Sequence, residues 1–180
     1  MAGSISATLI SKKIILSRRG SNEVAQSMPV WGSVYGIWPS SYVALSCLCA
    51  YRLTGDERLL HWSEAVGRAY AVQELPDGAV PAMDAGLGLG LLADLYDIPG
   101  EKIWLQAGLG LAERLVTCYL DAVLPRGAAG IDCYESQMGP SFLQHSLARI
   151  ALLARDRGTL CIRCRLYGAL RRCCRLLDLC

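Results

Sequence analysis

Apolar residues recur at helical spacing through the middle of the chain, in segments that come in pairs. The first segment, residues 42–51, is dense in Ala, Leu and Cys with almost no charge, and we expect Ser40 and Ser41 to cap it. The second, residues 57–73, is amphipathic. Between them stands Thr54-Gly55-Asp56, in which a glycine typical of a helix end precedes an aspartate typical of a helix start. This pattern predicts a helical hairpin.

The same pattern then repeats. Asp84 opens a second apolar segment over residues 85–93, Pro99-Gly100-Glu101 ends it, and residues 102–120 are again amphipathic. Tyr51-x-x-Thr-Gly-Asp aligns with Tyr96-x-x-Pro-Gly-Glu at a spacing of 45 residues. A period near 45 residues with two helices per unit is typical of helical arrays and toroids.

The two helices of each unit differ in kind. The first is apolar all round and should be buried, whereas the second has a charged face and should lie outside. A third apolar helix is expected over residues 142–154, and the connections 74–83 and 121–139 are long. The alternating glycines from Gly86 to Gly90 lie inside a helical segment and follow no strand, which favours close helix packing over phosphate binding. We therefore predict an all-α fold of antiparallel helical hairpins.

Composition agrees with a folded chain. Of 180 residues, 53% are hydrophobic and 19% charged, which excludes intrinsic disorder, and no apolar run reaches the ~18 residues of a membrane span. The net charge of +2 hides a basic start, an acidic middle and a basic end. We expect a basic N-terminal arm over residues 1–27 without stable structure, a helical domain over 28–158, and a basic, cysteine-rich helix over 159–180. Neither nucleic acid nor membrane is an expected partner.

The two ends of the chain also bear on compartment and metal binding. The basic N-terminus carries no acid before Glu23, which is compatible with a mitochondrial-type presequence as well as with a simple arm. Nine cysteines without a secretory signal favour reduced thiols and a cytoplasmic location. Cys161 and Cys164 form a C-x-x-C pair, but Cys173 and Cys174 are adjacent, which does not fit a common zinc ribbon. We expect neither a metal nor a cofactor.

Three segments carry a family resemblance. Residues 51–60 (Tyr-Arg-Leu-Thr-Gly-Asp-Glu-Arg-Leu-Leu), residues 85–96 (Ala-Gly-Leu-Gly-Leu-Gly-Leu-Leu-Ala-Asp-Leu-Tyr) and residues 99–105 (Pro-Gly-Glu-Lys-Ile-Trp-Leu) are similar to the six-hairpin toroid proteins. These are the (α/α)6 enzymes of carbohydrate metabolism, among them unsaturated glucuronyl hydrolases, other glycosidases and sugar 2-epimerases. The resemblance covers residues 30–158. It implies a partial toroid, because a closed ring needs twice the helices that this chain supplies.

The resemblance also implies where a site would lie, at the end of the ring where the long connections enter the inner helices. Asp84, with Asp132 or Glu135, is the candidate acid/base pair for glycoside cleavage. The aromatic and polar candidates for sugar binding are Trp31, Tyr35, Trp38, Tyr134 and Gln137.

Simpler interpretations stand beside these roles. Asp84 would also serve as a helix N-cap, and Asp132 and Glu135 as solvated loop acids. Trp31 and Trp38 would also pack under the N-terminal arm, and His145 is expected to be a core residue.

Two functions are thus compatible with the sequence. One is a glycosidase-like domain that acts on a carbohydrate, either complete and active or incomplete and of reduced or no activity. The other is a non-catalytic array of α-hairpins that binds a protein or peptide on its concave face. If the chain is an incomplete toroid, its open edge would expose Leu and Ala side chains and predicts homo-oligomers.

Overall fold

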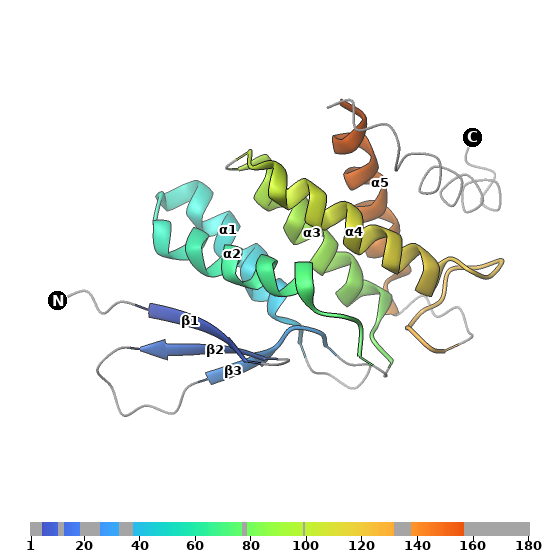
Figure 1. Cartoon of the computed structure of the whole chain (residues 1–180), viewed down its shortest axis with the longest axis horizontal. Helices are drawn as coiled ribbons and strands as arrows, with labels where there is room; N and C mark the ends of the chain where they lie inside the picture. The colour runs from blue at the N-terminus through green and yellow to red at the C-terminus, as the bar shows by residue number, and fades with distance from the viewer. Residues whose placement is uncertain are drawn as a thin grey trace.

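The computed structural model describes residues 5–10, 13–18, 26–32, 38–76, 79–98, 100–131 and 138–156. Within these ranges a small sheet precedes five helices (Figure 1). The strands are β1 (Ile5–Ile10), β2 (Lys13–Arg18) and β3 (Gln26–Pro29). The helices are α1 (Ser40–Thr54), α2 (Glu57–Val72), α3 (Ala82–Asp97), α4 (Lys102–Tyr119) and α5 (Pro140–Asp156). None of the described helices combines the length and the apolarity needed to cross a membrane.

Helices α1, α3 and α5 run parallel to one another and form one layer. Along α3, Gly86 lies against the start of α5, and Gly90 lies against Ser146 one turn further along α5. Near the other end of this layer, Asp94 of α3 forms ion pairs with Arg52 of α1 at 3.6 Å and with Arg149 of α5 at 2.7 Å. Because these contacts advance in the same direction along all the helices, the three N-termini lie at the same end of the layer.

Helices α2 and α4 run antiparallel to this layer and cover it. Gly88 of α3 packs against the ring of Tyr70 in α2, and Leu92 of α3 lies near Gly108 of α4. The core formed between the layers is dominated by Leu, Ala and Tyr. The predicted pairing of a buried first helix with an amphipathic second helix is confirmed for α3–α4, with α5 packed on α3. For α1–α2 the expected burial of the first helix is wrong, because α1 buries only Ser40, Ser41, Ala44 and Leu48, while Tyr42, Val43 and Leu53 are exposed.

The glycines of α3 have the packing role that the sequence indicates. A Cβ atom at Gly86 would lie 2.5 Å from the backbone N of Leu143 and 2.5 Å from the backbone C of Phe142. At Gly88 it would lie 2.5 Å from the ring of Tyr70. Both distances are far below an ordinary van der Waals contact, so only glycine allows α5 and α2 to approach α3 this closely.

The helix ends agree with the sequence at one junction and differ at another. Gly55 has a positive φ of 69°, and the Asp56 side chain accepts a hydrogen bond from the backbone N of Arg58, as expected for the α1–α2 turn. By contrast, Ser40 and Ser41 do not cap α1. Pro39 occupies the N-cap, and both serines are buried in the first turn, where Ser41 Oγ shares a hydrogen bond with the Tyr70 hydroxyl.

The N-terminal segment differs from the expected arm without stable structure. Residues 5–10 pair with residues 13–18, and residues 13–16 pair with residues 26–29, in an antiparallel sheet of order β1-β2-β3. The first two strands are rich in Ile and are separated by two residues, which favours a hairpin, and β1 lies beside α2. The expectation of an all-α chain is thus wrong for residues 5–29 and correct for the described part of residues 40–156. The proposed C-terminal helix over 159–180 lies outside the described residues.

Candidate functional site

The structure describes some of the candidate site residues and not others. Asp84, Trp31 and Trp38 are described. Those outside the described residues are Tyr35, Asp132, Tyr134, Glu135 and Gln137. The geometry of the expected site therefore rests on Asp84 and on the side chains around the N-terminal ends of α1, α3 and α5.

Asp84 occupies the third position of α3 and is buried. It is not the N-cap, because Pro81 occupies that position. An acid at the third position usually reaches back to the N-cap N–H in a capping box, but proline has no N–H to donate. The interpretation of Asp84 as a capping residue is therefore wrong, although the charge of its carboxylate would favour the helix dipole.

The carboxyl group of Asp84 is shielded from water, since the residue is only 2% exposed. Among the described residues, none forms a hydrogen bond with its Oδ2 atom. Burial raises the pKa of Asp84 to about 7, because the ionised form loses its hydration. At neutral pH a substantial fraction of the side chain is consequently protonated, and it can act as a proton donor.

Two buried tyrosines lie in electrostatic range of Asp84. The Tyr70 hydroxyl donates to the carbonyl oxygen of Val30 and hydrogen-bonds with Ser41, and the Tyr119 hydroxyl donates to the carbonyl oxygen of Val80 at 2.8 Å. Burial raises the pKa of both phenols, and the charge of Asp84 adds to this effect. Both tyrosines therefore stay neutral and fix the segments that precede α1 and α3.

The two described tryptophans have different surroundings. Trp31 is buried, with its ring edge-on to Tyr70 at 4.8 Å and its indole N–H donating to the carbonyl oxygen of Glu74 at 3.0 Å. Its ring holds the segment before α1 against α2, which is a packing role. Trp38 is exposed beside the start of α1, and its ring centroid lies 5.0 Å from that of Tyr42.

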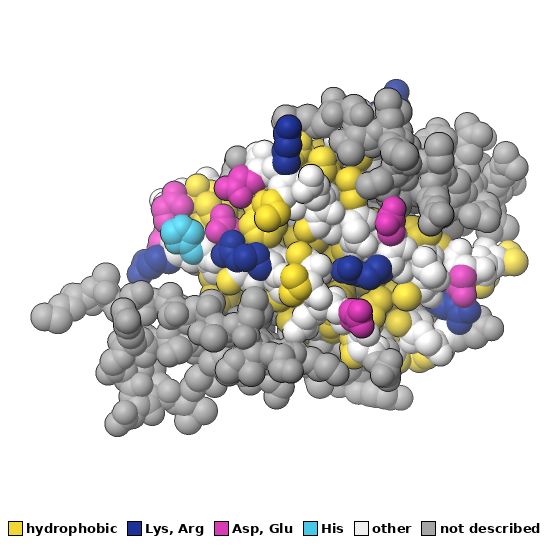
Figure 2. All heavy atoms as spheres, in the orientation of Figure 1, with side chains coloured by type: hydrophobic (Ala, Val, Ile, Leu, Met, Phe, Trp, Pro, Cys, Tyr) yellow, Lys and Arg dark blue, Asp and Glu magenta, His cyan; other side chains and the backbone are white. Residues whose placement is uncertain are grey.

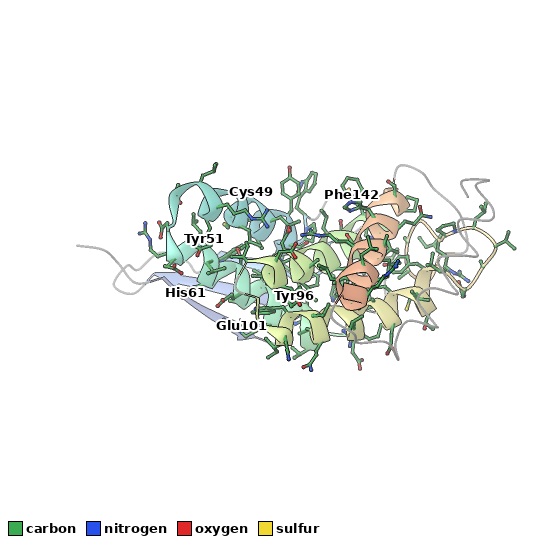
Figure 3. The ribbon with its side chains drawn as sticks, turned by 90° about the horizontal axis from the view of Figure 1, so that it is seen from above. Cys49, Tyr51, His61, Tyr96, Glu101 and Phe142 are labelled. Atoms are coloured by element: carbon green, nitrogen blue, oxygen red, sulfur yellow. The ribbon has the colours of Figure 1, made fainter. Side chains whose placement is uncertain are left out.

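A third exposed aromatic ring, that of Phe142, lies in the first turn of α5 (Figure 3). Because α3 packs between α1 and α5, exposed aromatic rings flank the end of the layer that contains Asp84. Of the predicted site residues, Asp84 and Trp38 lie at this end of the layer, whereas Tyr42 and Phe142 were not predicted as site residues.

His145 lies one turn after Phe142 in α5. It is exposed, so the expectation of a core histidine is wrong. The described residues contain no group of three or more His, Cys, Asp or Glu side chains arranged to hold a metal ion.

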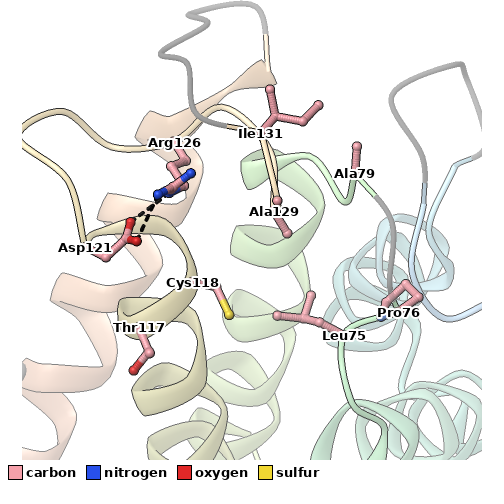
Figure 4. Close-up of a pocket in the computed structure, with 10 residues that line it drawn as sticks. Leu75, Pro76, Ala79, Thr117, Cys118, Asp121, Arg126, Ala129 and Ile131 are labelled. Atoms are coloured by element: carbon pink, nitrogen blue, oxygen red, sulfur yellow. Dashed lines mark hydrogen bonds and ion pairs between the residues drawn. The ribbon is translucent and has the colours of Figure 1, made fainter.

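A separate pocket of ≈ 600 Å³ opens at the C-terminal end of α4, and no sequence motif pointed to it (Figure 4). Its walls come from the end of α4, the segment after it and the segment between α2 and α3. Asp121 and Arg126, which lie together on one side of it, form an ion pair with Nε–Oδ1 at 2.7 Å and Nη2–Oδ2 at 2.9 Å. The residues that line the pocket come from three separate segments of the chain. They form no motif in the sequence, so sequence analysis could not identify the pocket.

The charges on the face seen in Figure 2 are mixed. Among the described residues on this face, basic and acidic side chains are interspersed and do not gather into one basic patch. In comparisons with protein-family models, curated proteins and solved structures, nothing matches this chain.

Proposed function

We propose that this chain is a carbohydrate-active domain of six-hairpin, glycosidase-like type, in which Asp84 is the proton donor. The observation that carries this proposal is the position of Asp84, buried without a capping role at the shared N-terminal end of α1, α3 and α5. A carboxyl group with a pKa of about 7 matches the requirement of general acid catalysis near neutral pH.

Glycoside cleavage needs a second group besides the acid. In this scheme Asp84 protonates the leaving glycosidic oxygen, while Asp132 or Glu135 activates water or attacks the anomeric carbon. Both acids precede α5 directly in the sequence, and α5 begins beside the first turn of α3, where Gly86 lies against Phe142. The scheme requires no metal and no cofactor.

The exposed rings supply a surface for the sugar. Trp38 and Tyr42 at α1, and Phe142 at α5, present apolar faces to solvent at this end. The C–H bonds of a pyranose ring are apolar and slightly positive, so they pack well on a π surface. Such contacts orient a sugar relative to Asp84 without adding charge.

An isosteric substitution tests the assignment. Incubation with unsaturated uronic-acid oligosaccharides should release sugar from the wild type, and Asp84→Asn should reduce kcat by about 10²-fold or more, since it removes the proton donor. Asp94→Asn is the matched control, because Asp94 lies on the same helix but at the opposite end, in the ion pairs with Arg52 and Arg149. Equal turnover by Asp84→Asn and wild type would contradict the assignment.

A second function is favoured by a different observation. The exposed apolar side chains of this layer are not confined to the Asp84 end, because Leu53 near the end of α1 is 88% exposed and Leu152 of α5 is 58% exposed. An amphipathic helix from a protein partner, or the same face of a second copy of this chain, would cover these residues.

Charge substitutions distinguish this second function from the first. Leu53→Lys and Leu152→Lys should abolish binding of a helical peptide that was selected against the wild type. Ile103→Lys is the control, because it places the same charge at an exposed apolar position on α4, where Ile103 is 60% exposed, and it should leave binding unchanged. If a second copy covers the face, the wild type should show concentration-dependent association in sedimentation, which both variants lose. Retention of binding and association in both variants would exclude this function.

A further inference from the structure

Buried polar side chains gather around the Tyr70 hydroxyl, where the first turns of α1 and α3 meet α2. Gly88 lies one turn after Asp84 on the same face of α3, and a Cβ atom there would meet the Tyr70 ring, so Asp84 lies on the side of α3 that faces this ring. Burial raises the pKa of Tyr70, and the side chains of Ser41 and Ser40 oppose this rise. The charge of Asp84 adds to it. Because such effects weaken with distance, these three side chains all lie near the same hydroxyl.

The acceptors in this cluster determine where its hydroxyl protons go. The carbonyl oxygen of Val30 can only accept a hydrogen bond, so the single proton of the Tyr70 hydroxyl goes to it. Ser41, whose Oγ lies 3.1 Å from the Tyr70 oxygen, then donates its own proton to Tyr70. Ser40 is the remaining hydroxyl of the cluster. It is fully buried, and none of the described residues forms a hydrogen bond with its Oγ, so its proton is available to a further acceptor.

Asp84 is the acceptor that this arrangement leaves without a donor. Its Oδ2 atom is buried and forms no hydrogen bond with any described residue. Because burial raises its pKa to about 7, a substantial fraction of the side chain is ionised at neutral pH. A buried carboxylate without a donor is costly, and so is a buried hydroxyl without a partner. One hydrogen bond from Ser40 to Asp84 removes both costs.

The other groups around Asp84 do not change charge near neutral pH. Within the described residues, the titratable groups that face it are two phenols, Tyr70 of α2 and Tyr119 of α4, and burial raises the pKa of both. Helix α1 contributes the two uncharged serines, and α5 approaches Gly86 of α3 through backbone atoms of its first turn. The cluster therefore responds to the ionisation of Asp84 through hydroxyl groups.

We propose that Ser40 is a positioning residue for Asp84, whose hydroxyl donates a hydrogen bond to the carboxylate that forms when Asp84 gives up its proton. In the proposed reaction this proton moves to the leaving glycosidic oxygen, which also keeps the electron pair of its broken bond to the anomeric carbon. The hydrogen bond from Ser40 stabilises the carboxylate and so strengthens Asp84 as an acid. The catalytic part of this role rests on the proposed function, whereas the hydrogen bond itself does not.

Carbon-13 NMR of the full chain with labelled aspartate measures the pKa of Asp84 directly, and Asp84→Asn assigns its carboxyl signal. Ser40→Ala should raise this pKa by about one pH unit, because it removes a hydrogen bond that favours the ionised form. An unchanged pKa of Asp84 in Ser40→Ala would overturn the proposal.

Two other buried serines are the controls. Ser41→Ala removes the donor to Tyr70. Ser63→Ala removes a hydroxyl that bonds to two carbonyl oxygens, at 3.0 and 2.9 Å, away from the cluster. Both variants lose a buried hydroxyl just as Ser40→Ala does, and we expect both to leave the pKa of Asp84 nearly unchanged. An equal rise of this pKa in Ser41→Ala would assign the effect to Tyr70 and reject the role of Ser40.

The pH dependence of turnover separates this proposal from the proposed function. If Asp84 is the proton donor, the alkaline limb of the pH–rate profile should move up in Ser40→Ala by the same interval as the pKa measured by NMR. A raised pKa without a matching move of this limb, or without turnover in the wild type, would reject the glycosidase-like function and leave the hydrogen bond in place. Turnover with both the limb and the pKa unchanged would reject the role of Ser40 alone.

Discussion

Helix α5 packs tightly against α3 at Gly86, and substitution of this glycine by alanine gives a quantitative test of the fold. The new methyl group would lie 2.5 Å from the backbone N of Leu143, 2.5 Å from the backbone C of Phe142 and 2.7 Å from the carbonyl oxygen of Phe142. All three atoms belong to the backbone of α5, so no side-chain rotation relieves the overlap. To restore ordinary contact, α5 must move away from α3 by roughly 1 Å.

The cost of this movement can be compared with the gain in helix propensity. Overpacking in a dense core costs about 1–3 kcal/mol, and the upper part of that range applies here because a whole helix must shift. Alanine recovers only about 1 kcal/mol over glycine in a helix. We therefore expect Gly86→Ala to lower the free energy of unfolding by about 1–2 kcal/mol, and Tm by roughly 2–8 °C for a chain of this length.

Gly110 provides the matched control. It lies within α4, is exposed, and a Cβ atom placed there would meet nothing within 4 Å. Gly110→Ala should therefore raise the stability by about 0.5–1 kcal/mol, the gain from propensity alone. Urea unfolding followed by circular dichroism measures both variants. If Gly86→Ala is as stable as Gly110→Ala, the close approach of α3 and α5 described above is wrong.

Three further predictions follow from single side chains. Burial raises the folded-state pKa of Asp84 from 3.8 to about 7, so the free energy of unfolding of the wild type should fall as pH rises from about 4 to about 7 and stay level above pH 7. In thermal melts at several pH values, Asp84→Asn should lack this pH dependence. Tyr119→Phe removes the buried hydroxyl that donates to Val80 and should cost about 1–2 kcal/mol in urea unfolding, whereas Tyr51→Phe, which loses only an exposed hydrogen bond, should cost little. Asp56→Ala removes the N-cap of α2 and should lower Tm, while the cap-preserving Asp56→Asn should restore most of it.

Local signals in the sequence were sufficient where structure depends on neighbours along the chain. Gly55 and Asp56 mark the turn between α1 and α2. Gly55 adopts the positive φ that ends α1, and Asp56 accepts a hydrogen bond from a free backbone N–H at the start of α2, so both roles depend only on neighbouring residues. Gly86 and Gly88 correctly indicated close helix packing. Glycine lowers the stability of a helix, and close contact with a neighbouring helix offsets that loss. The sequence could not name the atoms that they contact.

Other features depended on which segments meet. Ser41 resembles a cap in the sequence, but in the structure it is buried beside Tyr70, which is 29 residues away. Trp31 resembles an exposed aromatic ligand, yet its indole binds the carbonyl of Glu74 across 43 residues. The small sheet within residues 5–29 was also missed. The basic residues Lys12 and Lys13 interrupt the Ile-rich stretches, and the region was therefore interpreted as a basic arm without stable structure.

By itself, the sequence determined the helical hairpins, their turns and the close-packing glycines, because hydrophobic periodicity and backbone preferences act over a few residues. Only the tertiary structure decided that Asp84 is buried without a capping partner, that exposed rings flank it, and that the Asp121–Arg126 pair lines a pocket. Burial, pKa and cavity shape are set by residues from distant segments. Those contacts exist only once α1, α3 and α5 have packed in parallel, with α2 and α4 covering them.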